Sequence, residues 1–302
     1  MEMDIYKVSL ISIGLAISIV VTGVFLGTRS AEAENSGVYL MPPESSQEQE
    51  KDEGEKIKVE EVKIPEQEPL TAEEEALMID LRFDGGRNIV PTMRRNTNMS
   101  DSVFLVFKDD GINVSDLRNL LRDLKIANVR ATFFVSGRSL EENPQIWINA
   151  IADGHFVCNY TYSGEKIGDR PGLELIEDIK RWEIAAERAL GKEYVRHMKE
   201  HFPFFMFPDE RIVMEERFLT MVERSDYRPI GWEISSMDMY DENDSEEEKA
   251  QAVFEEIRRK SQGGEIISLN LNSYTVVYTR QMINSIRNKG LLFRELNRGF
   301  RV

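Results

Sequence analysis

A parallel α/β fold, with a sheet that helices cover and that closes or nearly closes into a barrel, is predicted for residues 102–302. Strand-like and helix-like segments alternate strictly from residue 102 onward, which is typical of parallel strands joined by helical crossovers. No glycine-rich phosphate loop follows the first strand, and this favours a barrel over an open doubly wound sheet. The spacing of the segments leaves both arrangements possible.

Seven segments rich in β-branched and aromatic residues are predicted as strands. They cover residues 103–107, 129–135, 155–159, 202–207, 227–234, 265–271 and 291–296. Six segments between them have the apolar periodicity of amphipathic helices. They cover residues 114–126, 144–152, 173–190, 212–224, 245–262 and 276–289. Pro144 near a first turn, and Ser245 three residues before Glu248, mark two of the helix starts.

An uninterrupted apolar run, residues 8–26, precedes this predicted domain. It carries no charge and shows no polar stripe, and at about 1.5 Å per residue it nearly crosses a hydrocarbon layer of roughly 30 Å. We therefore predict that residues 1–30 form a signal anchor, with a transmembrane helix at about residues 8–27. Ala31-Glu32-Ala33 resembles a small-x-small cleavage site, so a removable signal peptide stays an alternative.

Residues 31–75 are predicted to be an acidic, disordered linker. They hold 15 Asp and Glu against four Lys, which gives −11 of the whole chain's net charge of −16. Few of them are large and apolar, so burial cannot offset the entropy of ordering them. An acidic segment is translocated more readily than a basic one, which places the predicted barrel on the extracytoplasmic side of a single-pass membrane protein. Residues 76–101 are predicted to be a lead-in segment packed on the barrel.

The charge and cysteine content exclude two features. The chain has no basic footprint of the kind that nucleic acid requires. A single cysteine, Cys158, excludes an intramolecular disulfide, and its apolar neighbours predict a small buried residue rather than a nucleophile.

Three stretches carry the chemical signal. They read Phe107-Lys108-Asp109-Asp110-Gly111, Ala131-Thr132-Phe133-Phe134-Val135-Ser136-Gly137, and Gly154-His155 followed by Asn159-Tyr160-Thr161-Tyr162-Ser163-Gly164. Each comes at or directly after a predicted strand, and the working ends of β/α barrels are the carboxyl ends of their strands. The Asp-Asp-Gly sequence alone is also good turn punctuation, so the second stretch is what favours a site.

With these stretches, residues 102–302 resemble the polysaccharide deacetylase (NodB-homology) family. The resemblance implies a distorted (β/α)7 barrel that removes N- or O-acetyl groups from chitin- or peptidoglycan-like sugars with a divalent metal. It implies that Asp109 stands at the place of the general base and Asp110 at the place of a metal ligand. The family's His-Ser/Thr-x-x-His metal motif aligns with residues 160–164, where Tyr160 and Gly164 replace both histidines.

Two further family positions have changed. Met206 stands where the family has an arginine that orients the base, and Asn270 stands where it has a histidine that acts as general acid. An amide has no proton to give at a useful pKa. A catalytic zinc needs three protein ligands, so Asp110 by itself would not hold one, and we expect neither a metal nor another cofactor. His155 aligns ahead of the ligands and is expected to be a hydrogen-bonded strand residue.

The sequence therefore predicts a membrane-anchored, extracytoplasmic deacetylase-like protein that is catalytically inactive and binds cell-envelope glycan or an envelope protein. Its binding groove is expected to contain Asp109 as a vestigial base, together with Asp110, Tyr160, Trp232 and Asn270, although Trp232 could equally be a plain core residue. The alternative is an active carbohydrate deacetylase with a non-standard site, in which Asp109 is the base and Tyr160 donates to the oxyanion. The acidic linker could also act as a spacer or a docking tail.

His197 and His201 are spaced to lie on one face of a helix beside Glu200. They precede a predicted strand, which places them at the barrel end opposite the carboxyl ends of the strands. We predict two surface histidines near a helix end.

Overall fold

The computed structural model describes residues 62–80, 93–166, 172–208, 216–236, 241 and 243–301. They belong to one compact unit, residues 56–302. The apolar run at residues 8–26, and with it the predicted anchor, lies outside the described residues, as does most of the predicted linker. Within the described ranges, no helix has both the length and the apolar character needed to cross a membrane.

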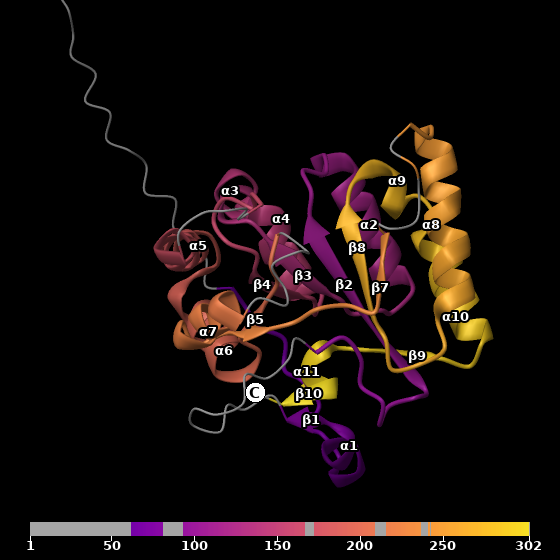
Figure 1. The fold of residues 1–302 in the computed structure, drawn as a ribbon, viewed down its shortest axis with the longest axis horizontal. Coiled ribbons are helices and arrows are strands. Elements are labelled where there is room, and N and C mark those ends of the chain that lie inside the picture. Colours follow the sequence, from indigo (N-terminus) through magenta and orange to yellow (C-terminus); the bar gives the residue numbers. More distant parts are fainter. Residues whose placement is uncertain are drawn as a thin grey trace, which may run out of the picture. The chain divides into compact units, whose positions relative to one another are not determined.

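Parallel strands form the central sheet in the order β6-β5-β4-β3-β2-β8-β7 (Figure 1). Their bounds are β2 Ser102–Asp109, β3 Thr132–Val135, β4 Phe156–Asn159, β5 Phe204–Phe205, β6 Arg228–Pro229, β7 Ile234–Ser235 and β8 Ile266–Leu271. A further strand, β9 (Leu292–Arg294), pairs with the first three residues of β2. Among the described residues β6 and β7, the two ends of this order, do not pair with each other, and the sheet is a curled half-barrel.

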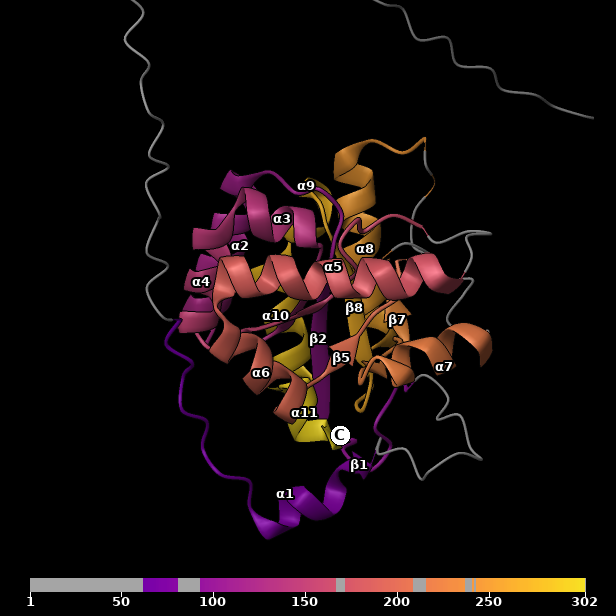
Figure 2. The same ribbon diagram turned by 90° about the vertical axis from the view of Figure 1, so that its left-hand side faces the viewer.

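Helices lie around the outside of this curled sheet, with α8 and α10 on one flank and α5, α6 and α7 on the other (Figures 1 and 2). Their bounds are α2 Val114–Ile126, α3 Gly137–Glu142, α4 Pro144–Ala152, α5 Gly172–Leu190, α6 Lys192–His201, α7 Glu216–Arg224, α8 Glu246–Lys260, α9 Ser273–Val276 and α10 Thr279–Asn288. Phe107 stacks on Phe133, and Phe133 in turn meets the edge of Trp147 from α4. These fully buried rings join the sheet to its helical layer.

Strands β2 and β8 point toward the end of the domain where α3 and α9 begin (Figure 1). Four short elements lie at the opposite end (Figures 1 and 2). They are α1 Ala72–Leu77, β1 Ile79–Asp80, α11 Leu296–Gly299 and β10 Phe300–Arg301. The domain thus has a carboxyl end, which carries the predicted site, and an amino end, which the two extremities of the described chain cover.

Several segments differ from the sequence-based prediction, and two of the observed helices, α3 and α6, lie outside the six predicted ones. The single strand predicted at residues 227–234 is wrong, because the chain leaves β6 at Ile230 and Gly231, bridges Met93, and then enters β7. Backbone groups of residues 93–96 receive hydrogen bonds from Gly231 and Ile266, so this part of the lead-in lies between β6 and β8. The helix predicted at residues 276–289 is divided into α9 and α10.

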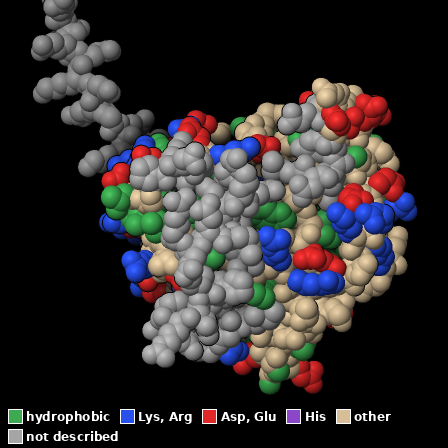
Figure 3. Space-filling model, viewed as in Figure 1, with side chains coloured by type: hydrophobic (Ala, Val, Ile, Leu, Met, Phe, Trp, Pro, Cys, Tyr) green, Lys and Arg blue, Asp and Glu red, His purple; other side chains and the backbone are tan. Residues whose placement is uncertain are grey.

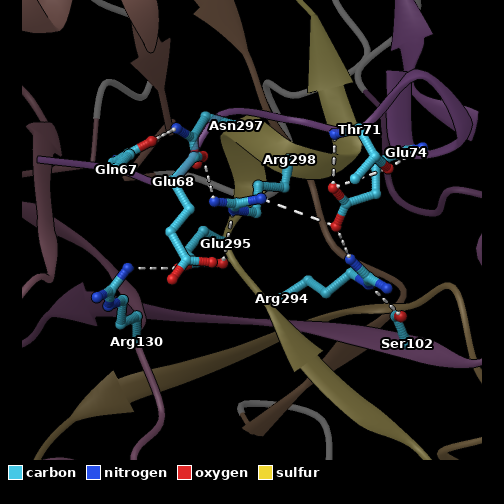
Figure 4. Close-up of polar contacts among 10 residues, drawn as sticks. All are labelled: Gln67, Glu68, Thr71, Glu74, Ser102, Arg130, Arg294, Glu295, Asn297 and Arg298. Atoms are coloured by element: carbon cyan, nitrogen blue, oxygen red, sulfur yellow. Dashed lines mark hydrogen bonds and ion pairs between the residues drawn. The ribbon is translucent and has the colours of Figure 1, made fainter. Parts of the chain in front are cut away.

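The predicted linker also ends earlier than expected. Residues 62–77 form an arm that packs on the domain, with Val62 buried and α1 started by a capping box between Thr71 and Glu74. Arg294 donates to Glu74 at 2.8 Å, and Arg298 donates to the backbone carbonyl of Glu68 at 2.7 Å (Figure 4). These contacts and the burial of Val62 offset the entropy of ordering the arm, so the assignment of residues 62–75 to a disordered linker is corrected.

On the face seen in Figure 3, charge is mixed rather than basic. Lys and Arg side chains lie among Asp and Glu side chains over the face in Figure 3, and acidic groups gather where α8 begins. That first turn carries Glu246, Glu247 and Glu248, which suit the positive end of the helix dipole.

Candidate functional site

Asp109 is the last residue of β2, and Ser136 holds its carboxylate. Both the backbone N–H and the hydroxyl of Ser136 donate to Asp109 Oδ2, at 3.0 Å and 2.6 Å. The same hydroxyl oxygen accepts from the N–H of Ser139 and so caps α3. One oxygen of the predicted base is therefore fixed by two hydrogen bonds at the start of a helix.

Asp110 is exposed and is held by two amides. The Nδ2 atoms of Asn270 and Asn272 donate to Asp110 Oδ2 at 3.3 Å and 3.0 Å. Asn270 is itself fixed, because its N–H donates to Ser236 Oγ at 3.0 Å and its carbonyl accepts from Thr275 Oγ1. Asn270 Oδ1 is buried without a hydrogen-bond partner among the described residues.

Tyr160 and Gly164 lie in the tight loop that follows β4. Tyr160 is only 6% exposed, and the next residue, Thr161, adopts a left-handed φ of 65°. Gly164 has a φ of 66°, and a Cβ atom there would lie 3.2 Å from Cβ of Ser136. A side chain at position 164 would therefore meet both backbone strain and a close neighbour.

Trp232 is partly buried, and a lysine covers one side of its ring. Nζ of Lys108 lies 4.1 Å from the centroid of that ring, a cation–π geometry. Lys108 is 2% exposed and is in register with Asn270 of β8 and Phe134 of β3. Because paired residues of neighbouring strands share a face of the sheet, the ammonium group lies on the same side of the sheet as Asn270.

The structure thus brings Asp109, Asp110, Tyr160 and Asn270 to the carboxyl end of the sheet, and Trp232 lies against Lys108, one residue before Asp109. Three polar contributors were not predicted: Ser136, Lys108 and Asn272. Ser136 and Lys108 stand inside the motif stretches that carry the family resemblance. Asn272 carries a weaker signal, an Asn three residues before Thr275 that caps α9.

The divalent metal that the family resemblance implies does not fit these residues. In the described part of the chain, no three His, Cys, Asp or Glu side chains stand close enough together to hold an ion. Tyr160 and Gly164 occupy the aligned ligand positions, and the facing oxygen of Asp110 is engaged by amides. A shell of at least three ligands cannot be assembled from them.

His155 and Cys158 have structural roles. His155 Nδ1 accepts from the N–H of Ala131 at 3.1 Å, and its ring meets Phe133 edge-on. Burial lowers the pKa of His155 to about 4, so the imidazole is neutral at physiological pH. Cys158 is fully buried, and burial raises the pKa of its thiol, which makes it unreactive.

His197 and His201 lie on α6 at the amino end of the domain, just before β5. This is the end opposite Asp109 and Asp110, as predicted from the sequence. Neither imidazole approaches the carboxylate pair.

Comparison with known proteins agrees with this fold. Residues 95–203 match the family model described as polysaccharide deacetylase. A chitooligosaccharide deacetylase from Azorhizobium caulinodans is 27% identical over 176 residues, which cover 58% of this chain and 76% of that protein.

Two solved structures share the fold. A peptidoglycan N-acetylglucosamine deacetylase superposes with a TM-score of 0.58 and 23% identity, over 69% of this chain and 92% of the other. A pseudoenzyme of carbohydrate esterase family 4 from Bacillus anthracis superposes with a TM-score of 0.55 and 19% identity, over 67% of each chain. At these identities the likeness concerns the fold alone.

Proposed function

Since residues 95–203 belong to the polysaccharide deacetylase family, we propose that this chain is a catalytically inactive member that binds cell-envelope glycan. We further propose that residues 1–30 anchor it in a membrane and that the domain lies on the extracytoplasmic side. A protein partner in the envelope is the competing ligand.

The observation that carries this proposal is that two amide groups, rather than metal-ligating side chains, surround the Asp110 carboxylate. In the family resemblance this carboxylate would ligate a metal together with side chains at positions 160 and 164. Here those positions are a tyrosine and a left-handed glycine, while the Asp110 oxygen accepts from Asn270 and Asn272. The N–H groups of two amides thus contact the carboxylate oxygen that would otherwise contact a metal ion.

Proton delivery is also lost in this proposal. Asn270 occupies the position of the family's general acid, and an amide does not protonate a leaving amine. Asp109 could still accept a proton, but Ser136 already donates twice to one of its oxygens. The groups needed to activate water and to protonate the leaving group are therefore not both present among the described residues.

The same groups suit sugar binding. Carboxylates and amides pair with hydroxyl groups, and a half-buried indole offers an apolar face. The buried Oδ1 atom of Asn270 lacks a partner among the described residues, so a ligand hydroxyl or a bridging water would satisfy it. The five residues expected from the sequence remain our proposed binding groups: Asp109, Asp110, Tyr160, Trp232 and Asn270.

The binding experiment is calorimetric titration of the full chain with chitin and peptidoglycan oligosaccharides. We expect saturable heat that is lost in Asp110→Asn and Trp232→Ala. Glu193→Gln, an exposed change on α6, is the matched control and should bind normally. No heat with either glycan would reject the glycan ligand and favour the protein partner.

The second candidate function is an active deacetylase with a non-standard site. Both aspartates persist at the end of β2, and Tyr160 follows directly after β4, which is what favours this alternative. It predicts acetate release from an acetylated chitooligosaccharide and loss of that release in Asp109→Ala. We expect no release from the unaltered chain.

The location is tested separately. If the anchor and its orientation are as proposed, the domain is cleaved by protease added to intact cells, and the chain stays in the membrane fraction. Recovery of the whole chain in the soluble fraction, or protection from external protease, would contradict the proposal.

A further inference from the structure

The amino end of the domain carries a second group of possible ligands. His197 and His201 stand one turn apart on α6, and their ring centroids are 4.4 Å apart. The chain has three histidines, and the third, His155, is buried against Ala131 and Phe133. Every accessible imidazole of the protein is therefore in this pair.

The separation of the two rings suits one shared ion. A zinc–imidazole bond is about 2.0–2.1 Å, which places the ring centroid about 3 Å from the metal. Two rings on one ion then have centroids about 5 Å apart at the tetrahedral angle of zinc and roughly 4.5 Å apart at the right angle of a tetragonal Cu²⁺ site. The 4.4 Å spacing on α6 is close to the tetragonal value.

The pair opens into a cleft of about 600 Å³. One wall is α6 with Phe202, and the other is the arm, at Ile64 and Leu70, beside Asn297 of α11. Asn297 donates through Nδ2 to Gln67 at 2.8 Å, as Figure 4 shows. Asn297 lines the same cleft as the two imidazoles, and its Oδ1 is buried without a hydrogen-bond partner among the described residues.

The two imidazoles favour one class of metal ion. Neutral imidazole suits borderline divalent ions such as Zn²⁺, Ni²⁺ and Cu²⁺, while Mg²⁺ and Ca²⁺ prefer sites made of oxygen alone.

We propose that His197 and His201, with Asn297 as a neighbouring oxygen donor, bind one borderline transition-metal ion at the end of the domain opposite Asp109 and Asp110. The protein supplies two nitrogen ligands and one oxygen, and water completes the shell. Such a site is exchangeable rather than structural, because structural zinc sites use four protein ligands. The site is separate from the proposed glycan groove and stands or falls independently of it.

The test is titration of the full chain with Cu²⁺ and with Zn²⁺, followed by calorimetry and, for Cu²⁺, by electron paramagnetic resonance. We expect one ion per chain and a copper spectrum with splitting from two nitrogens. His197→Gln and His201→Gln should each weaken binding by more than roughly tenfold, since even outer-shell partners are typically worth 10–100-fold. Asn297→Ala should weaken it less.

Asp110→Asn is the matched control and should leave this binding unchanged. Circular dichroism checks that each variant is folded, which is expected because His201 is exposed and His197 half-buried. Absence of binding by the unaltered chain would overturn the proposal. So would binding that survives both histidine substitutions.

Discussion

Nδ2 of Asn270 lies 3.3 Å from Oδ2 of Asp110, across the paired strands β2 and β8. In the family resemblance, position 110 would bind the metal ion and position 270 would protonate the leaving group. Here they bind each other, and the second amide, from Asn272, donates to the same oxygen at 3.0 Å. The carboxyl end of the sheet is thus stabilised by contacts among its own side chains.

Asn270→Asp should destabilise the protein in a pH-dependent way. The new carboxylate would face Asp110 within hydrogen-bond distance, and like charges raise the pKa of one member of such a pair in the folded state. A carboxyl group whose pKa is raised on folding lowers the free energy of unfolding as pH rises above its unfolded pKa of about 3.9. We therefore expect Asn270→Asp to lower the free energy of unfolding by about 1–3 kcal/mol at pH 7 and by little near pH 4. Urea unfolding at both pH values measures this.

Asn270→Leu is the control for that experiment. It removes the same amide without adding a charge, so its effect on the free energy of unfolding should be similar at both pH values. If Asn270→Asp behaves like Asn270→Leu, the two side chains do not face each other as described.

Gly164→Ala should destabilise the protein more than Gly111→Ala does. Both glycines have positive φ, so both substitutions carry the left-handed penalty of about 1–2 kcal/mol. Only at Gly164 does the new Cβ meet a neighbour, Ser136, at 3.2 Å, whereas nothing lies within 4 Å at Gly111. Equal losses in thermal unfolding would show that the loop after β4 is less tight than described.

His155 should make stability fall as the solution is acidified. Burial lowers its folded pKa to about 4, while the unfolded value is about 6.5. As pH falls, the imidazole is protonated in the unfolded state before it is protonated in the folded state. The free energy of unfolding therefore decreases by about 3 kcal/mol in total between about pH 6.5 and pH 4. His155→Gln, which keeps an acceptor for Ala131, should flatten the dependence, and an unchanged slope would contradict the assignment.

The arm at residues 62–77 should contribute to stability through its buried contact. Val62 is 6% exposed and Leu77 is 40% exposed. Val62→Ser should cost about 1–3 kcal/mol, the burial free energy of such a side chain, and Leu77→Ser clearly less. Equal effects in chemical unfolding would mean that the arm is not packed on the domain.

Much of the fold could be predicted from the sequence because its local signals agree with the tertiary structure. The helices at α2 and α4 have the predicted bounds, since Asn113 caps one and Pro144 starts the other. The split between β6 and β7 could not be predicted, because it depends on Met93 and Ile266, which are distant in sequence. Pairing between segments distant in the chain produces no periodic pattern of apolar residues in the local sequence.

In the candidate site, too, local signals could be predicted from the sequence and contacts between distant residues could not. The motif stretches, which follow predicted strands, are enough to predict that Asp109, Asp110 and Tyr160 lie at one end of the sheet, and the family resemblance with the predicted strand 265–271 adds Asn270. The contacts of Asp110 with Asn272, and of Asp109 with Ser136, depend on loop geometry and side-chain rotamers, which the sequence does not encode in a readable spacing.

The central claim, that the two aspartates do not hold a metal, is tested most directly by zinc titration of a His197→Gln, His201→Gln double variant. This background removes the site that we propose at the amino end. We predict no stoichiometric zinc in this variant. One zinc per chain that is lost on adding Asp110→Asn would contradict the claim.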